Sequence, residues 1–140
     1  MQVSNEILNN IASEMELGLI CYIHRDTLEV VAIPDEDRFF GMEVEAWKED
    51  IKKIKKAKRK FIEIKKMESS RSFDVMAEFA ESLPECPTKI RLITALEGHK
   101  PFANFNHQIH QAADHKENWF KFKREKNIEW IARQLDYDPL

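Results

Sequence analysis

The chain has 140 residues, of which 43% are hydrophobic and 34% are charged, and its formal net charge at pH 7 is −3. This length is typical of one domain, and nine Phe and three Trp supply enough apolar surface for a packed core, which excludes a disordered chain. We therefore expect a single domain over residues 1–140.

From the sequence we expect neither a membrane span nor an export signal. Its apolar runs are far shorter than the roughly 20 residues that cross a bilayer, and the N-terminus MQVSNEILNN lacks the basic and apolar regions of a signal peptide. Cys21 and Cys86 lie far apart and show no metal-ligand spacing, so both are expected to be reduced thiols. A cytoplasmic protein without membrane contact is predicted.

The N-terminal third predicts a helix followed by a β-hairpin. Residues 4–16 carry an apolar stripe with Ser4 as N-cap, and Gly18 ends this helix. Residues 17–33, LGLICYIHRDTLEVVAI, contain two apolar runs on either side of the polar turn 24–27, which is typical of two antiparallel strands. One face of this hairpin can line a core while the other meets a second layer.

A basic helix and a third strand are expected next. After Pro34 an acidic loop, Asp35-Glu36-Asp37, precedes Phe39 and Phe40. A second helix should run from about Val44 to Lys58, and its single buried stripe should consist of Val44, Trp47, Ile51 and Ile54. The alternating segment KFIEIK, residues 60–65, predicts a third strand.

The C-terminal half predicts four helices. They should span residues 69–83 with Ser69 or Ser70 as N-cap, 87–97 between Pro87 and Gly98, a segment starting at Pro101, and about 117–135. The expected stripes are Phe73, Met76, Phe79, Ala80 and Leu83, then Ile90, Ile93, Ala95 and Leu96, then Phe102, Phe105, Ile109 and Ala113. The apolar residues of the last helix do not share one face, so it is either apolar on two sides or broken near residues 124–127.

These elements predict an α+β fold. A small antiparallel sheet, formed by the N-terminal hairpin and one further strand, should be covered by several helices, and the C-terminal half should be helical. Large side chains must cover so small a sheet. We expect the core to include Phe102, Phe105, Trp119 and Trp130.

Several motifs resemble those of an uncharacterised bacterial protein family of unknown function. They are Ala95-Leu96-Glu97-Gly98, Pro101-Phe102, Phe105, Trp119, Phe122 and Trp130, preceded by Met76 and Phe79 and by the hairpin. The motif residues are Gly, Phe and Trp at helix ends and on apolar faces, so the resemblance implies shared architecture and supplies no catalytic residues. The basic segment around residues 52–60 is longer than this family implies.

The charge is strongly segregated along the chain. Residues 1–46 hold ten acids and two bases, whereas residues 47–66 hold ten bases and three acids. The bases expected on the exposed side of the second helix are Lys52, Lys53, Lys55, Lys56, Lys58, Arg59 and Lys60. This pattern could bind an acidic protein or, weakly and without sequence preference, a nucleic acid. A solvated face is the competing interpretation, because acids at the helix start and bases at its end complement the helix dipole, with Glu49–Lys53 as a potential pair.

Motifs for catalysis or cofactor binding are absent. Three glycines cannot form a dinucleotide-binding or phosphate-binding loop, and HExxH, GxSxG and paired-Cys motifs are missing. His107, His110 and Asp114, with His115 nearby, are the one group with metal-ligand chemistry, yet a helical wheel places the first three on the solvent side. We therefore predict no cofactor and no metal.

Two classes of function remain open. A small, non-enzymatic interaction or regulatory module fits the segregated charge and the missing catalytic motifs. The alternative is a small metal-dependent or carboxylate/His hydrolase that uses the C-terminal helices. The sequence favours the first class.

Overall fold

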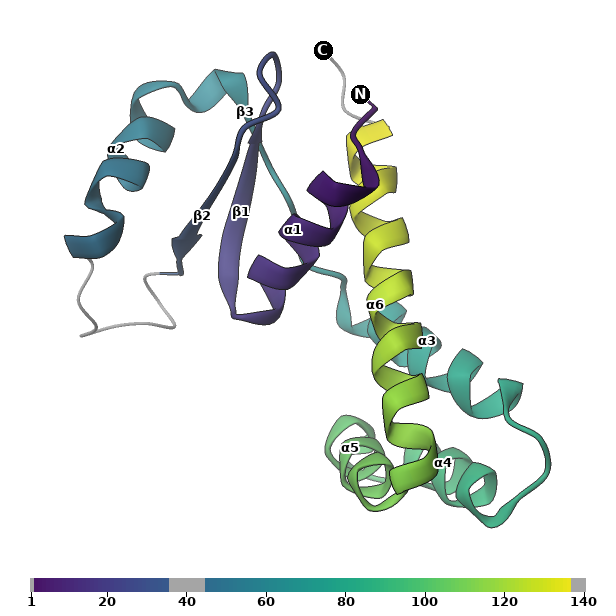
Figure 1. Ribbon diagram of the computed structural model, residues 1–140. Helices are drawn as coiled ribbons and strands as arrows, with labels where there is room; N and C mark the ends of the chain where they lie inside the picture. Colours follow the sequence, from purple (N-terminus) through teal and green to yellow (C-terminus); the bar gives the residue numbers. More distant parts are fainter. Residues whose placement is uncertain (1, 36–44, 137–140) are drawn as a thin grey trace. The chain divides into compact units, whose positions relative to one another are not determined.

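The computed structural model describes residues 2–35 and 45–136, and within these ranges it contains six α-helices and a three-stranded antiparallel sheet (Figure 1). The predicted α+β class with a helical C-terminal half is therefore confirmed. The chain forms two compact units, one of Met1–Lys66 with Ile128–Leu140 and one of Met67–Asn127. That residues 1–140 behave as a single domain stays a prediction. Among the described residues no helix is both long and apolar enough to cross a membrane.

Helix α1, Asn5–Glu16, starts where the sequence predicts. The Ser4 hydroxyl accepts a hydrogen bond from the backbone N–H of Ile7 at 3.2 Å, which satisfies one of the donors left unpaired at a helix start. Gly18 has a φ of 87°, a conformation that glycine adopts without strain, and it leads the chain from the helix into the first strand.

The sheet is built around β1, Leu19–His24, which lies between β2, Val30–Pro34, and β3, Phe61–Glu63. Tyr22 pairs with Val31 on one side and with Glu63 on the other. The predicted hairpin is thus present, although its connection is longer than residues 24–27 and includes Leu28 with a φ of 63°. The third strand, β3, is also present but is shorter than the predicted segment, residues 60–65.

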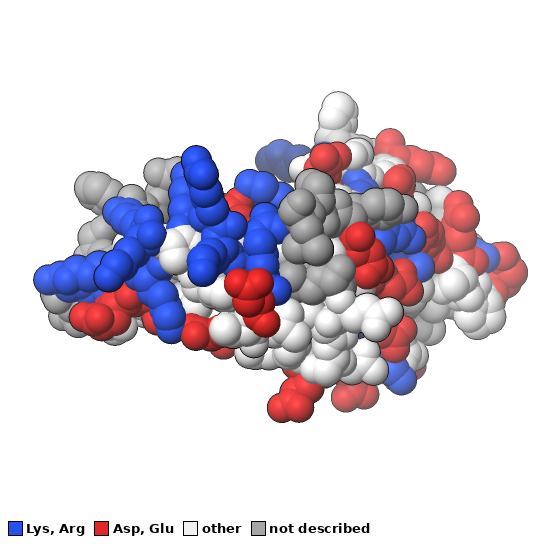
Figure 2. Space-filling view, turned by 90° about the horizontal axis from the view of Figure 1, so that it is seen from above, with Lys and Arg blue, Asp and Glu red and all other residues white. Residues whose placement is uncertain are grey.

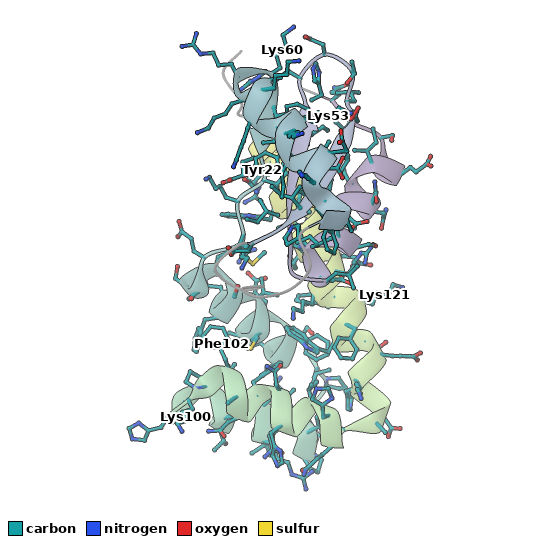
Figure 3. All side chains as sticks on the ribbon, turned by 90° about the vertical axis from the view of Figure 1, so that its left-hand side faces the viewer. Tyr22, Lys53, Lys60, Lys100, Phe102 and Lys121 are labelled. Carbon is teal, nitrogen blue, oxygen red and sulfur yellow. The ribbon has the colours of Figure 1, made fainter. Side chains whose placement is uncertain are left out.

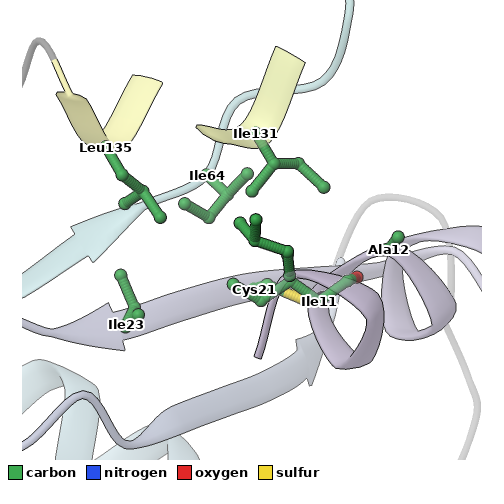
Figure 4. Packing of buried hydrophobic residues seen from close by; sticks show 8 residues of the cluster. Ile11, Ala12, Cys21, Ile23, Ile64, Ile131 and Leu135 are labelled. Carbon is green, nitrogen blue, oxygen red and sulfur yellow. Dashed lines mark hydrogen bonds between the residues drawn. The ribbon is translucent and has the colours of Figure 1, made fainter. Parts of the chain in front are cut away.

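One face of the sheet packs against α1 and the C-terminal part of α6, Ala113–Asp136, within the first unit (Figure 4). Cys21 and Ile23 of β1 are completely buried on this face. The cluster consists of Leu8, Ile11, Ala12, Cys21, Ile23, Ile64, Ile131 and Leu135. Alternate residues of β1 therefore point into this core, because successive side chains of a strand point to opposite faces of the sheet.

The other face of the sheet is covered by α2, Lys48–Lys56. Ile54 of α2 packs against Val31 and Phe61, and Tyr22, Ile33 and Ala57 contact this cluster. The first unit is therefore a sheet between two helical layers. Ile54, predicted on the buried stripe, is 6% exposed, whereas Trp47 is only half-buried.

The basic helix is shorter than predicted. A 3₁₀-helix, η1, spans Glu45–Trp47, α2 ends at Lys56, and a second 3₁₀-helix, η2, spans Lys58–Lys60. Ala57, with φ −125° and ψ 40°, leaves the α-helical conformation so that the chain can turn into β3. Three of the seven predicted bases therefore lie on a separate turn. Val44 and the acidic and aromatic residues 36–40 lie outside the described residues.

Two side chains of α6 satisfy the backbone just after β3. The Gln134 amide accepts from Lys65 N–H at 2.8 Å and donates to Lys65 C=O at 2.9 Å, and the Trp130 indole N–H donates to the same carbonyl at 2.9 Å. Trp130 was expected in the core, but it is half-buried because its N–H reaches this backbone oxygen.

The second unit is a group of helices: α3, Ser69–Ser82; α4, Pro87–Glu97; α5, Pro101–Gln111; and the N-terminal part of α6. The predicted serine caps are wrong, since Glu68 holds the N-cap position and makes no side-chain capping bond. The core of this unit consists of Val75, Met76, Phe79, Ala80, Leu92, Phe105, Ile109 and Trp119.

Two predicted core positions of the second unit are exposed. Ile90 is 62% exposed and Phe102 is 39% exposed, whereas Leu92, which the predicted stripe omitted, is fully buried. Ile90 lies about 200° around α4 from Leu92 at about 100° per residue, so only one of them can face the core. Phe105 is fully buried and its ring lies 4.9 Å from that of Trp119, as the core prediction requires.

Helix α6 is continuous over 24 residues, which decides between the two alternatives for the last helix. Trp119 and Phe122 join the core of the second unit, whereas Ile131 and Leu135 join that of the first. The helix is therefore apolar on two sides. It begins at Ala113 instead of Glu117, and Ala113 is exposed instead of continuing the stripe of α5.

Phe105→Ala should lower the free energy of unfolding by about 3–5 kcal/mol, because it removes a fully buried ring and leaves a cavity. Urea unfolding followed by tryptophan fluorescence measures the loss. Phe102→Ala is the matched control and should cost much less, since Phe102 is 39% exposed. Equal losses in the two variants would contradict the burial described here.

Stability should fall at alkaline pH. Burial, with a smaller contribution from Glu14, raises the pKa of the Cys21 thiol from 9.0 to about 12, so above pH 9.0 the unfolded chain loses a proton that the folded chain retains. Burial and the neighbouring Glu63 also raise the pKa of Tyr22 to about 12. The contribution of these two groups to the free energy of unfolding should therefore be constant below about pH 9 and decrease from there towards pH 12.

Urea unfolding at about pH 8 and about pH 10.5 tests this dependence. Cys21→Ala should reduce the loss of stability between the two pH values, because the buried thiol is gone. Cys86→Ala, which removes the half-buried cysteine, should leave the loss unchanged. If both variants respond to pH like the wild type, the raised thiol pKa is wrong.

Candidate basic surface

The seven predicted bases form one exposed surface, which we call the basic surface. It comprises Lys52, Lys53, Lys55 and Lys56 of α2 and Lys58, Arg59 and Lys60 of η2. All seven side chains are exposed, and Figure 2 shows Lys and Arg side chains gathered at its left, over these elements. Figure 3 views the same region from the side of α2, with Lys53 and Lys60 labelled.

The position of α2 on the sheet explains this exposure. Ile54 is the buried residue of the helix, and its contact with Val31 and Phe61 turns one narrow side of α2 towards the sheet. The rest of a helix with a single apolar stripe must face water, and here those positions are occupied by lysines. The packing of one face of the sheet therefore directs the charges outwards.

Lys53 pairs with the hairpin instead of with its own helix. Its ammonium group donates to both carboxylate oxygens of Glu29, with a distance of 2.9 Å to Oε2. The potential Glu49–Lys53 pair is thus replaced by a contact between α2 and the residue before β2. Within residues 2–35 and 45–136, Lys53 is the one member of the basic surface with a carboxylate partner.

Arg25 holds η2 in place. Its backbone N–H donates to the carbonyl of Lys60 at 2.8 Å, and its side-chain Nε–H donates to the carbonyl of Arg59 at 3.1 Å. These bonds connect the hairpin turn to the turn that carries three bases. Sequence reasoning assigned Arg25 only to a polar turn, because the bonds depend on the pairing of β1 with β3, in which residues such as Tyr22 and Glu63 are far apart in the sequence.

Like charges are close neighbours on α2. Lys52 is three residues from Lys55 and four from Lys56, and residues at these spacings lie beside each other on a helix. Such a pair of equal charges destabilises a helix by roughly 0.2–0.5 kcal/mol. This repulsion opposes the favourable interaction of Lys55 and Lys56, in the last turn of α2, with the helix dipole.

The predicted metal candidates do not form a site. His107 and His110 lie on α5 and Asp114 lies on α6, and all three side chains are exposed. The ring of His107 lies beside the Gln111 amide, with 3.1 Å between Nε2 atoms, and that of His110 lies 6.2 Å from Phe120. Among the described residues no three His, Cys, Asp or Glu side chains are grouped so that they could hold a metal ion.

Two further polar features of the second unit involve side chains that interact with other parts of the same unit. Glu78 pairs with Arg71 at 3.0 Å and with Lys126 at 3.7 Å, and the hydrogen bond from Arg71 is the main cause of its lowered pKa. This cluster ties α3 to α6. An open groove beside Ile90 and Arg91 of α4 also receives Asn104 of α5, whose amide already donates to the His99 carbonyl at 2.6 Å.

The sequence matches an uncharacterised protein family, UPF0158, over residues 35–139. The chain belongs to UPF0158. The matched region includes the basic surface and the helices that carry the Ala-Leu-Glu-Gly and aromatic motifs, whereas α1 and the hairpin precede it. No curated protein and no solved structure matches the chain. The expected membership of a family of unknown function is thus confirmed, and UPF0158 supplies no activity.

Replacing Lys52, Lys55 and Lys56 by Gln removes repulsion of roughly 0.2–0.5 kcal/mol for each like-charge pair. It also removes two charges from the last turn of α2, where each interacts with the helix dipole by roughly 0.3–1 kcal/mol. The free energy of unfolding should therefore change by less than about 1 kcal/mol. Lys53→Gln should instead lower it by up to about 1 kcal/mol, since the exposed pair with Glu29 is lost. Urea unfolding at low salt measures both effects, and high salt should diminish them. A triple variant that loses much more than about 1 kcal/mol would mean that these lysines have attractive partners in the folded protein.

Proposed function

We propose that this protein is a small, non-enzymatic interaction module that binds a polyanionic partner through the basic surface. The observation that supports the proposal is the exposure of seven bases on two consecutive short elements, of which Lys53 alone pairs with a carboxylate within the described residues. An anionic partner would relieve the repulsion among these bases. The free cysteines agree with a cytoplasmic location, which we include in the proposal.

The architecture supports a preformed surface. Ile54 anchors α2 to the sheet, Glu29 holds Lys53, and Arg25 holds the backbone of η2. The backbone positions of the bases are therefore defined before a partner binds, which reduces the entropy lost on association. A merely solvated face does not require such anchoring of its charged turn.

The alternative, a hydrolase that uses the C-terminal helices, has less support. Its candidate residues His107, His110 and Asp114 are exposed, and α5 ends between the histidines and the aspartate. Exposed side chains are held less firmly than metal ligands and general bases, which further hydrogen bonds orient.

Retention on a heparin column tests the proposal, because heparin is a dense polyanion. The Lys52→Gln, Lys55→Gln, Lys56→Gln triple variant should elute at lower salt than the wild type. A triple variant of Lys66, Lys121 and Lys123 to Gln is the matched control, since these lysines are also exposed and the change in net charge is the same. Its elution should shift much less.

The result that would overturn the proposal is equal behaviour of the two triple variants. Retention would then depend on net charge alone, and the bases of α2 would be a solvated face. Circular dichroism of each variant shows whether the fold is intact, so that a lost interaction is not confused with unfolding.

A further inference from the structure

We infer that the polyanion bound by the basic surface is double-helical nucleic acid, contacted through its phosphate backbone without sequence preference. This inference rests on the proposed function and names the partner. Three features of the described part of the first unit support it: the composition of the basic surface and, within α2 and η2, the absence of an exposed large hydrophobic residue and of an exposed aromatic ring.

The basic surface lacks the anchor residues of a protein interface. Such interfaces derive most of their energy from a few large side chains, often Trp or Tyr, buried at the centre. The exposed large hydrophobic residues of the described chain are Leu17, Ile90, Phe102 and Phe120, and none belongs to α2 or η2. An acidic protein would therefore find charge here but no apolar contact, whereas phosphate contacts need none.

Two described aromatic rings near the basic surface, those of Phe61 and Tyr22, are not available for stacking on bases, and Trp47, which precedes α2, is half-buried. Phe61 is 7% exposed, and its ring packs edge-on against His24 at 5.0 Å. Tyr22 is half-buried, and its hydroxyl donates to Glu63 at 3.1 Å. Proteins that prefer single strands combine a basic groove with exposed aromatic platforms, so this surface should favour the higher charge density of a duplex.

The kind and placement of the bases agree with phosphate contacts. Six of the seven are lysines, which act as point charges, whereas the recognition of base edges and carboxylates relies more on the planar, bidentate Arg. Lys48, Lys52 and Lys55 follow one another at helical spacing along one side of α2, and η2 continues the bases beyond the helix. Lysines in a row along a helix that is fixed to the sheet can contact successive phosphates of a nucleic-acid backbone.

The number of bases limits the strength of the interaction. Apart from Lys53, six bases of the surface have no carboxylate partner among the described residues. Contact between all six and DNA phosphates would give a log–log salt dependence with a slope no steeper than about −5. The dissociation constant at physiological salt should be roughly 10⁻⁴–10⁻⁶ M, as for other non-specific contacts.

Fluorescence anisotropy with a labelled DNA duplex of about 20 base pairs, titrated with the full chain at several salt concentrations, tests the inference. Neutralising Lys52, Lys55 and Lys56 should make the slope shallower by about 3, while the Lys66, Lys121 and Lys123 control should keep the wild-type slope. Two unrelated duplex sequences should bind equally. Single-stranded DNA of the same sequence and poly-glutamate should bind more weakly than the duplex.

Outcomes against the inference can be told apart from failure of the proposed function. If heparin retention depends on the three lysines but the duplex does not bind, or if poly-glutamate or the single strand binds more tightly, the proposed function holds and the duplex is the wrong partner. Nanomolar, sequence-selective binding would also overturn the inference, because backbone contacts cannot produce it. If retention is the same in both triple variants, the proposed function itself fails.

Discussion

The central strand β1 is the constraint on which the first unit depends. It is hydrogen-bonded on both edges and covered on both faces, so its alternate side chains must satisfy two different layers. Cys21 and Ile23 are completely buried against α1 and α6, while Tyr22 faces the layer formed by α2. A lone hairpin is only marginally stable in water, and the third strand together with these two layers supplies the apolar burial that it requires.

The exposure of the basic surface follows from that constraint. β3 must lie beside β1, so the chain has to leave the α-helix at Ala57 and turn immediately into Phe61. The bases at the end of the helix are thereby transferred to a short turn, where Arg25 binds their backbone. A surface proposed to bind anions is thus held by the same strand pairing that builds the core.

The two units share one helix. The N-terminal part of α6 contributes Trp119 to one core, and its C-terminal part contributes Ile131 and Leu135 to the other. Between these residues the helix is unbroken, although its sequence there is strongly charged. The residues at positions 123–126, Lys, Arg, Glu and Lys, have high helix propensity and favour its continuity there.

The sequence alone determined the helices and strands that are specified by residues close to them in the chain. Ser4 and Gly18 delimit α1, alternating apolar residues predict the hairpin, and the Pro and Gly residues around α4 mark its ends, since each of these signals acts within a few residues of chain. The family resemblance rested on similar residues and is confirmed over residues 35–139.

Tertiary packing decided which side of each helix faces the core, which the spacing of apolar residues alone does not determine. A helix with several apolar residues can turn either side inwards, and only packing places Leu92 and Phe105 inside while leaving Ile90 and Phe102 exposed. For the same reason Lys53 pairs with Glu29, far away in sequence, instead of with Glu49, and Gln134 binds the backbone of Lys65. The sequence predicted which bases would be exposed, and the strand pairing of the folded chain decided how they are held.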